Sequence, residues 1–155
     1  ADLLCEQLLL GVVFHAAEEK LFAEEIRKTF FTDEIPGLEV ARLIRGMEEG
    51  VSYGSSDVGD VSWVVPTGGF NTATFVPGSP AHSWQSTACA GHSIGRKGMV
   101  VAAKTLALST MDLMNDPKLI EDARKSFGKR KGTGVYRSRL PDDQKPPLDY
   151  RRDGR

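Results

Sequence analysis

Long hydrophobic runs are missing from this chain of 155 residues. A membrane-spanning helix needs about 20 consecutive apolar residues, and no stretch approaches that length. The segment from Leu3 to Phe14 is apolar, but Glu6 and Gln7 interrupt it and no basic residues precede it, which argues against a signal peptide. We therefore expect no transmembrane segment and no membrane partner. The content of 40% hydrophobic and 26% charged residues is typical of globular proteins.

Cysteine is also scarce, because the chain has only Cys5 and Cys89. The two lie far apart and form no Cys-x-x-Cys pair, so neither a secreted disulfide framework nor a thiolate zinc motif is indicated. This usage fits a reducing compartment, and we predict a cytoplasmic location.

A net charge of one sign is absent, since 20 basic and 21 acidic side chains leave a formal charge of -1. Basic residues do gather from Arg124 to Arg155, where 11 Lys or Arg accompany four Asp. No aromatic platform for stacking bases accompanies them. We interpret this stretch as a solvated tail and expect no nucleic-acid partner.

Helices are predicted where apolar side chains recur at helical spacing and capping residues flank them. The predicted helices cover residues 2–10, 16–31, 94–114 and 117–128, with Gly128 as the end of the last. The expected apolar faces are Leu21, Phe22, Ile26 and Phe30 in the second helix, and Met99, Ala103, Leu106, Ala107, Thr110, Met111 and Met114 in the third.

The other segments carry weaker signals. Residues 71–76 read as a short buried strand between Gly69 and Pro77, whereas residues 57–65 could form a strand or a short helix. A single helical turn is expected near residues 40–45, and an extended tail after residue 128.

Three groups of residues could carry chemistry. His82, Cys89 and His92 could form a zinc site, but their spacing matches no compact ligand motif. Asp57 and Asp60 are three residues apart and suit turns and caps as well as a site. Gly91-His92-Ser93-Ile94-Gly95 has the spacing of a serine-hydrolase elbow, which requires a strand directly before it. The same loop, with Arg96 and Lys97 nearby, could instead bind an anion at a helix start.

Two motifs resemble the aminobenzoyl-glutamate utilisation proteins. Those proteins belong to a large family of metal-dependent peptidases and amidohydrolases, which also holds aminoacylases and N-acyl-amino-acid hydrolases. The motifs are Asp57-Val58-Gly59-Asp60-Val61-Ser62-Trp63 and His82-Ser83-Trp84-Gln85, and the resemblance continues through Ser93–Met99, Asp116-Pro117 and Pro146-Pro147-Leu148. It covers most of residues 16–148.

The resemblance implies an α/β fold, a helix-sheet-helix layered catalytic domain of the phosphorylase/hydrolase-like zinc peptidase type that is incomplete in this chain. Residues 1–12 would end a dimerisation domain or connect to it. Residues 13–128 would be the C-terminal part of the catalytic domain, and residues 129–155 a basic tail containing proline and glycine.

The resemblance also implies site residues. His82 would be the last metal ligand of a centre that holds two zinc ions, or manganese, bridged by the attacking water. Ser83, Trp84, Gly91 and Ser93 would line the substrate pocket. Asp57 and Asp60 would support the ligands without binding metal.

The remaining ligands and the general base of the family have no match in this sequence. One imidazole cannot hold a hydrolytic zinc ion, which takes about three protein ligands. We therefore predict that the chain supplies one ligand and part of the pocket to a metallo-amidohydrolase and is inactive alone. The substrate would be an N-acyl or aminobenzoyl amino acid or a small dipeptide, and the partners a missing N-terminal catalytic half and further copies in a homo-oligomer. The alternative is a non-catalytic binding or oligomerisation module left from a truncated hydrolase.

Overall fold

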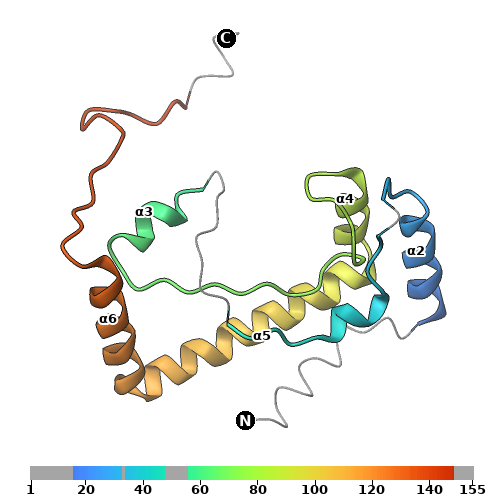
Figure 1. Ribbon diagram of the computed structural model, residues 1–155, viewed down its shortest axis with the longest axis horizontal. Coiled ribbons are helices and arrows are strands. Elements are labelled where there is room, and N and C mark those ends of the chain that lie inside the picture. The colour runs from blue at the N-terminus through green and yellow to red at the C-terminus, as the bar shows by residue number, and fades with distance from the viewer. Residues whose placement is uncertain (1–15, 33, 48–55, 149–155) are drawn as a thin grey trace. The chain divides into compact units, whose positions relative to one another are not determined.

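Helices are the regular elements of this protein in the computed structural model, which describes residues 16–32, 34–47 and 56–148 (Figure 1). Those residues contain no strand, so the predicted α/β fold with a layered sheet is wrong. The segment expected as a strand, residues 71–76, is extended but has no neighbouring strand to pair with. An extended segment becomes part of a sheet only through such pairing. The helix expected over residues 2–10 lies outside the described residues.

The chain divides into two compact units. Among the described residues, the first unit holds residues 16–47 and 69–119, and the second holds residues 56–68 and 120–148. Both units are therefore discontinuous in sequence. The domain boundaries expected after residues 12 and 128 stay predictions.

Helix α2 spans Ala17–Arg27 and confirms the predicted helix, although it ends four residues earlier than expected. Glu18 and Glu19 stand in its first turn, where acidic side chains favour the helix dipole. The buried side chains are Glu19, Ala23 and Ile26, at the i, i+4, i+7 spacing of one helix face. The expected apolar face was wrong in part, since Leu21 is 61% exposed.

Two short elements follow in the chain. The 3₁₀ helix η1 spans Leu38–Arg42 and confirms a helical turn close to the expected position. Helix α3, Val58–Ser62 in the second unit, settles the ambiguous segment as helical. Because α3 has no buried residue, its apolar side chains Val58 and Val61 lie at the surface of this chain.

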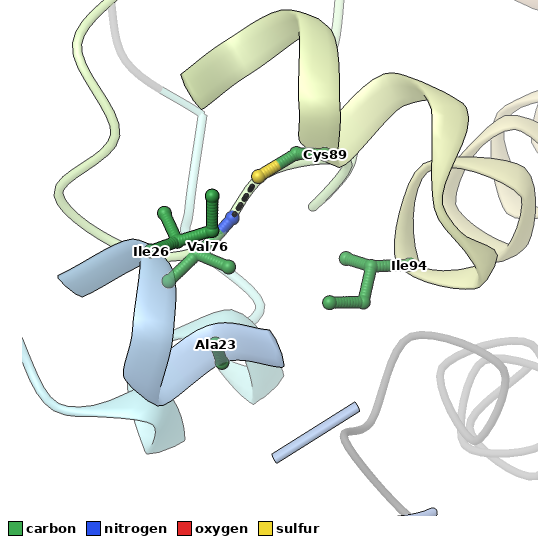
Figure 2. Packing of buried hydrophobic residues seen from close by; sticks show 5 residues of the cluster. All are labelled: Ala23, Ile26, Val76, Cys89 and Ile94. Carbon is green, nitrogen blue, oxygen red and sulfur yellow. Dashed lines mark hydrogen bonds between the residues drawn. The ribbon is translucent and has the colours of Figure 1, made fainter. Parts of the chain in front are cut away.

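Helix α4 spans Trp84–Gly91 and was not predicted, since residues 86–90 were read as a weak strand. The small residues of this helix let it pack closely in the core of the first unit. Figure 2 shows that core, which joins α2, α4, the start of α5 and the extended segment at Val76. The buried amide of Val76 donates a hydrogen bond to Cys89 Sγ at 3.5 Å, so the thiol satisfies a backbone group that has no strand partner (Figure 2).

Helix α5 spans Ser93–Asn115 and confirms the predicted long helix. Its buried residues are Ile94, Gly95, Gly98 and Val101, all in the first nine positions. The predicted face was therefore wrong, because Met99, Leu106, Met111 and Met114 are 55–79% exposed. Two glycines admit neighbouring backbone: a Cβ at Gly95 would lie 2.6 Å from the carbonyl oxygens of Cys89 and Ala90, and one at Gly98 would overlap the carbonyl of Ala73.

Helix α6 spans Pro117–Lys131 and runs through Gly128, where it was expected to end. Gly132 ends it instead, with a φ of 55° in the left-handed region that glycine adopts without strain. Residues 132–148 contain no helix or strand, which confirms the extended tail. In the second unit Gly134 lies against the ring of Trp63, which ties this tail to the end of α3.

No helix among the described residues has both the length and the apolar character that crossing a membrane requires.

Candidate functional site

The turn that carries His82 precedes helix α4. His82 has a φ of 55°, the one positive φ among the described residues other than glycine. An L-residue in this region costs roughly 1–2 kcal/mol, although histidine tolerates it better than branched residues do. The imidazole is exposed and forms no hydrogen bond with another described residue. The turn therefore presents a free ring at its tip, and such local strain is often found at functional sites.

Ser83 fixes this turn to α4. Its hydroxyl accepts a hydrogen bond from the Ser86 amide at 3.2 Å, and Ser86 Oγ accepts one from the Ser83 amide, also at 3.2 Å. This reciprocal capping box satisfies two amides at the helix start. The Ser83 hydroxyl also donates to the carbonyl of Pro80 at 2.7 Å, which closes the turn around His82. Its observed role is capping, and its role in binding substrate stays a prediction.

Trp84 is the first residue of α4 and is 59% exposed beside the His82 turn. Gly91 is the last residue of the same helix, and its carbonyl accepts a hydrogen bond from Arg96 at 3.0 Å. The α4 helix separates the two ends by about 12 Å, at 1.5 Å per residue. The predicted pocket residues thus fall into two groups, with Ser83 and Trp84 at one end of α4 and Gly91 and Ser93 at the other.

The Gly91–Gly95 segment joins two helices, because α4 ends at Gly91 and α5 begins at Ser93. A serine-hydrolase elbow needs a strand before the nucleophile, and a helix stands in that place. The serine-hydrolase alternative is therefore wrong for this segment. The anion-binding alternative is corrected too, since the cation of Lys97 is paired with a carboxylate of the chain itself, that of Glu19.

Glu19 is the centre of a polar cluster that reasoning from the sequence missed. Its side chain is 2% exposed, Ser93 Oγ donates a hydrogen bond to it at 2.6 Å, and Lys97 Nζ lies 2.6 Å from it. Ser93 and Lys97 are four residues apart on α5, so both face α2. The signal available in the sequence was the i, i+4, i+7 row of Glu19, Ala23 and Ile26, in which an acid shares a face with two apolar residues.

His92 extends this cluster. Its ring stacks on Phe22 with centroids 4.0 Å apart and planes 3° apart, and its Nδ1 lies 3.3 Å from Ser93 Oγ. Gln85 provides a second tie between α4 and α2, because its amide donates to Thr29 Oγ1 at 3.3 Å. Both ends of α2 are thus held against the α4–α5 pair.

The pKa of Glu19 reflects opposing effects. Burial by itself raises the pKa of this carboxyl, but hydrogen bonds from Lys97 and Ser93 and the charge of Lys97 lower it from 4.5 to about 2. The carboxylate is therefore ionised in the folded protein at neutral pH, as a buried acceptor of several donors should be.

We expect acid to weaken the first unit through Glu19. A pKa lowered by folding adds stability above the unfolded value of 4.5, and that stability is lost as the pH falls towards 2. The shift corresponds to on the order of 3 kcal/mol. Urea denaturation of wild type and Glu19→Gln between pH 6 and pH 2.5 measures it, because only the wild type contains this titrating group. The gap between the two curves should narrow in acid, and a constant gap would contradict the expectation.

The described residues contain no group of three or more His, Cys, Asp or Glu side chains that could hold a metal ion. His82 and His92 lie at opposite ends of α4, and Cys89 is fully buried in the core between them. These three residues therefore do not converge on one ion. A zinc or manganese site at His82 would need ligands from elsewhere, so the residues present do not make up the site alone.

Asp57 and Asp60 belong to the second unit, whereas His82 belongs to the first. Both acids are exposed, and Asp57 occupies the N-cap position of α3 without a side-chain cap bond. Ser56 supplies a local one, since its Oγ accepts from the Val58 amide at 3.1 Å. Support of metal ligands by these two acids stays a prediction.

Comparison with known proteins adds one relationship. The chain is 32% identical over 127 residues to a protein of Escherichia coli (strain K12) that is named as one of the subunits of p-aminobenzoyl-glutamate hydrolase. The match covers 82% of this chain and 25% of that protein, so the chain spans about a quarter of the relative's length. No protein-family profile matches the chain, and no solved structure does. The resemblance expected from the two motifs is confirmed.

Proposed function

We propose, on the premise that this chain is related to the aminobenzoyl-glutamate utilisation proteins, that it forms part of a hydrolase acting on the amide bond of an aminobenzoyl amino acid. The observation that carries the proposal is 32% identity across 82% of the chain to a protein named for that activity. The name of the relative describes one part of an enzyme with several polypeptides, which supports the expectation that this chain works with further polypeptide.

His82 is the residue proposed to bind a catalytic metal, as one ligand among others that the described residues do not supply. Support comes from its position, because a capped turn holds an exposed imidazole in a strained conformation before α4. Imidazole is a common ligand for zinc and other transition metals. Trp84, exposed beside this turn, is proposed to contact the aromatic part of the substrate.

A chimera tests this function. The aligned quarter of the Escherichia coli relative is replaced by residues of this chain, and hydrolysis of p-aminobenzoyl-glutamate and bound metal are both measured. We expect activity in the chimera. We also expect His82→Gly to lower it by more than about 100-fold with loss of metal, since even residues that only orient ligands cost 10–100-fold.

Glycine is the right replacement because it removes the imidazole and accepts a φ of 55° without strain. Ala81→Gly is the matched control, since it adds the same backbone freedom one residue earlier and leaves the ring in place. A folded chimera that lacks activity would reject the function. An active chimera whose His82→Gly variant keeps its metal and its rate would reject the role of His82.

A non-catalytic association module is the second candidate, and the surface of α5 favours it. Beyond Val101 the helix buries no residue, while Leu106, Met111 and Met114 are 55–79% exposed. Exposed apolar faces of this kind commonly mark contacts with other polypeptide. Sedimentation of the isolated chain distinguishes the candidates: a stable oligomer with no gain of activity in the chimera supports the module.

A further inference from the structure

The direction of the hydrogen bonds around Ser93 determines the protonation of His92. Glu19 is an ionised carboxylate and can only accept hydrogen bonds. Ser93 Oγ lies 2.6 Å from Glu19 Oε1, the short distance expected for a hydroxyl that donates to a carboxylate. The single hydroxyl proton of Ser93 is therefore directed at Glu19.

His92 contacts the same hydroxyl from the other side, with Nδ1 at 3.3 Å from Ser93 Oγ. Because the hydroxyl proton is committed to Glu19, Ser93 can only accept a hydrogen bond from His92. Nδ1 must then carry the hydrogen, and in the neutral ring the lone pair lies on Nε2. This order is the reverse of a catalytic triad, in which the imidazole accepts the proton of the serine.

The ring is also fixed in orientation and open at Nε2. Stacking on Phe22 at 4.0 Å sets its plane, and the contact to Ser93 sets its rotation. Nε2 forms no hydrogen bond with a described residue, and those residues include no buried side-chain nitrogen or oxygen without a partner. The lone pair of Nε2 is therefore accessible to solvent.

We propose that His92 is an oriented base whose Nε2 accepts a hydrogen bond or a proton from an N–H or O–H group of a ligand, with Ser93 and Glu19 as its positioning residues. In proton transfer the N–H or O–H bond of the ligand breaks, its electron pair stays on the ligand atom, and an N–H bond forms at Nε2. The charge that the ring gains faces the Glu19 carboxylate through Ser93, while Lys97 is the cation on the far side of that carboxylate. Second partners of this kind commonly fix the tautomer of functional histidines.

This inference does not rest on the proposed hydrolase function. His92 is separated from the His82 turn by the length of α4, about 12 Å. Failure of the chimera would leave the proposal for His92 intact, and a different tautomer of His92 would leave the role of His82 intact.

Nitrogen-15 NMR of the whole labelled chain tests the tautomer directly through the long-range couplings of the imidazole ring. In neutral His92 we expect a protonated Nδ1 and an unprotonated Nε2. Ser93→Ala should shift the tautomer ratio towards Nε2–H by roughly fivefold, the effect of one net hydrogen bond. Ser83→Ala is the control, because it removes a helix cap at the other end of α4 and leaves the Ser93 contacts in place. An Nε2–H ring in the wild type would overturn the proposal without any variant.

Reactivity tests the accessibility of Nε2. Diethyl pyrocarbonate transfers an ethoxycarbonyl group to an unprotonated imidazole nitrogen, and peptide mapping reports each histidine separately. We expect modification of His92 in the wild type, and slower modification in Ser93→Ala by a similar factor of about five. A wild-type His92 that resists the reagent while His82 reacts would show that Nε2 is covered, which would also overturn the proposal.

Discussion

Gly98→Ala should destabilise the first unit by about 2 kcal/mol, even though alanine is the better helix former. Gly98 lies in the interior of α5, where propensity alone predicts a gain of roughly 0.5–1 kcal/mol. The extended segment at Ala73 and Thr74 crosses the helix there, and an added Cβ would overlap the carbonyl of Ala73. The same crossing brings Thr72 Oγ1 to the Gly98 carbonyl at 3.0 Å, a bond that a displaced segment would lose.

Gly128→Ala is the matched control, because Gly128 also lies inside a helix but no atom stands within 4 Å of its added Cβ. It should stabilise α6 by the amount that propensity predicts. Each unit has one tryptophan, so Trp84 reports on the first in a Trp63→Phe background and Trp63 on the second in a Trp84→Phe background. Urea midpoints that rise in both variants would show that the segment does not press on α5.

Glu19→Ala should destabilise the first unit by about 2–3 kcal/mol. The change leaves Ser93 without its acceptor and Lys97 without its counter-charge, while α2 loses its contact to the start of α5. The expected loss lies at the lower end for a broken buried pair, because the Lys97 side chain is 34% exposed and its ammonium group can regain water. Glu19→Gln should cost less, since its amide oxygen still accepts from Ser93.

Glu25→Ala is the control for Glu19→Ala. It removes an ion pair of the same length from the same helix, since Lys28 Nζ lies 2.6 Å from Glu25 Oε1. Both side chains of that pair are 68% exposed, so we expect little change in the urea midpoint. Equal losses in the two variants would mean that burial of Glu19 adds nothing to its contribution.

Helix positions were largely predictable, whereas buried faces were not. Residues 93–115 and 117–131 contain helix formers in periodic patterns with clear starts, and local capping chemistry suffices to place such helices. The face of α5 that becomes buried is decided by what packs on it. Ile94, Gly98 and Val101 are buried because a loop and α4 meet them, whereas the more apolar row through Leu106 and Met111 has no neighbour among the described residues.

Helix α4 shows a limit of reasoning from propensity. Residues 84–91 contain serine, threonine and glycine, which favour caps and turns over helix interiors. The Ser83–Ser86 capping box and the burial of Cys89 against Val76 stabilise the helix nonetheless. The capping pair was visible in the sequence, but the contact to Val76 joins residues 13 apart and required the fold.

The sequence by itself determined three things about this protein: the starts of its long helices, the extended tail, and the relationship to aminobenzoyl-glutamate utilisation proteins through the motifs at Asp57 and His82. These depend on local chemistry or on matching residues, and both can be read along the chain. Only the tertiary structure decided that Glu19, Ser93 and Lys97 meet, and that His82 and His92 point from opposite ends of one helix. The reason is that such contacts join residues more than 70 positions apart, or depend on a helix that only packing stabilises.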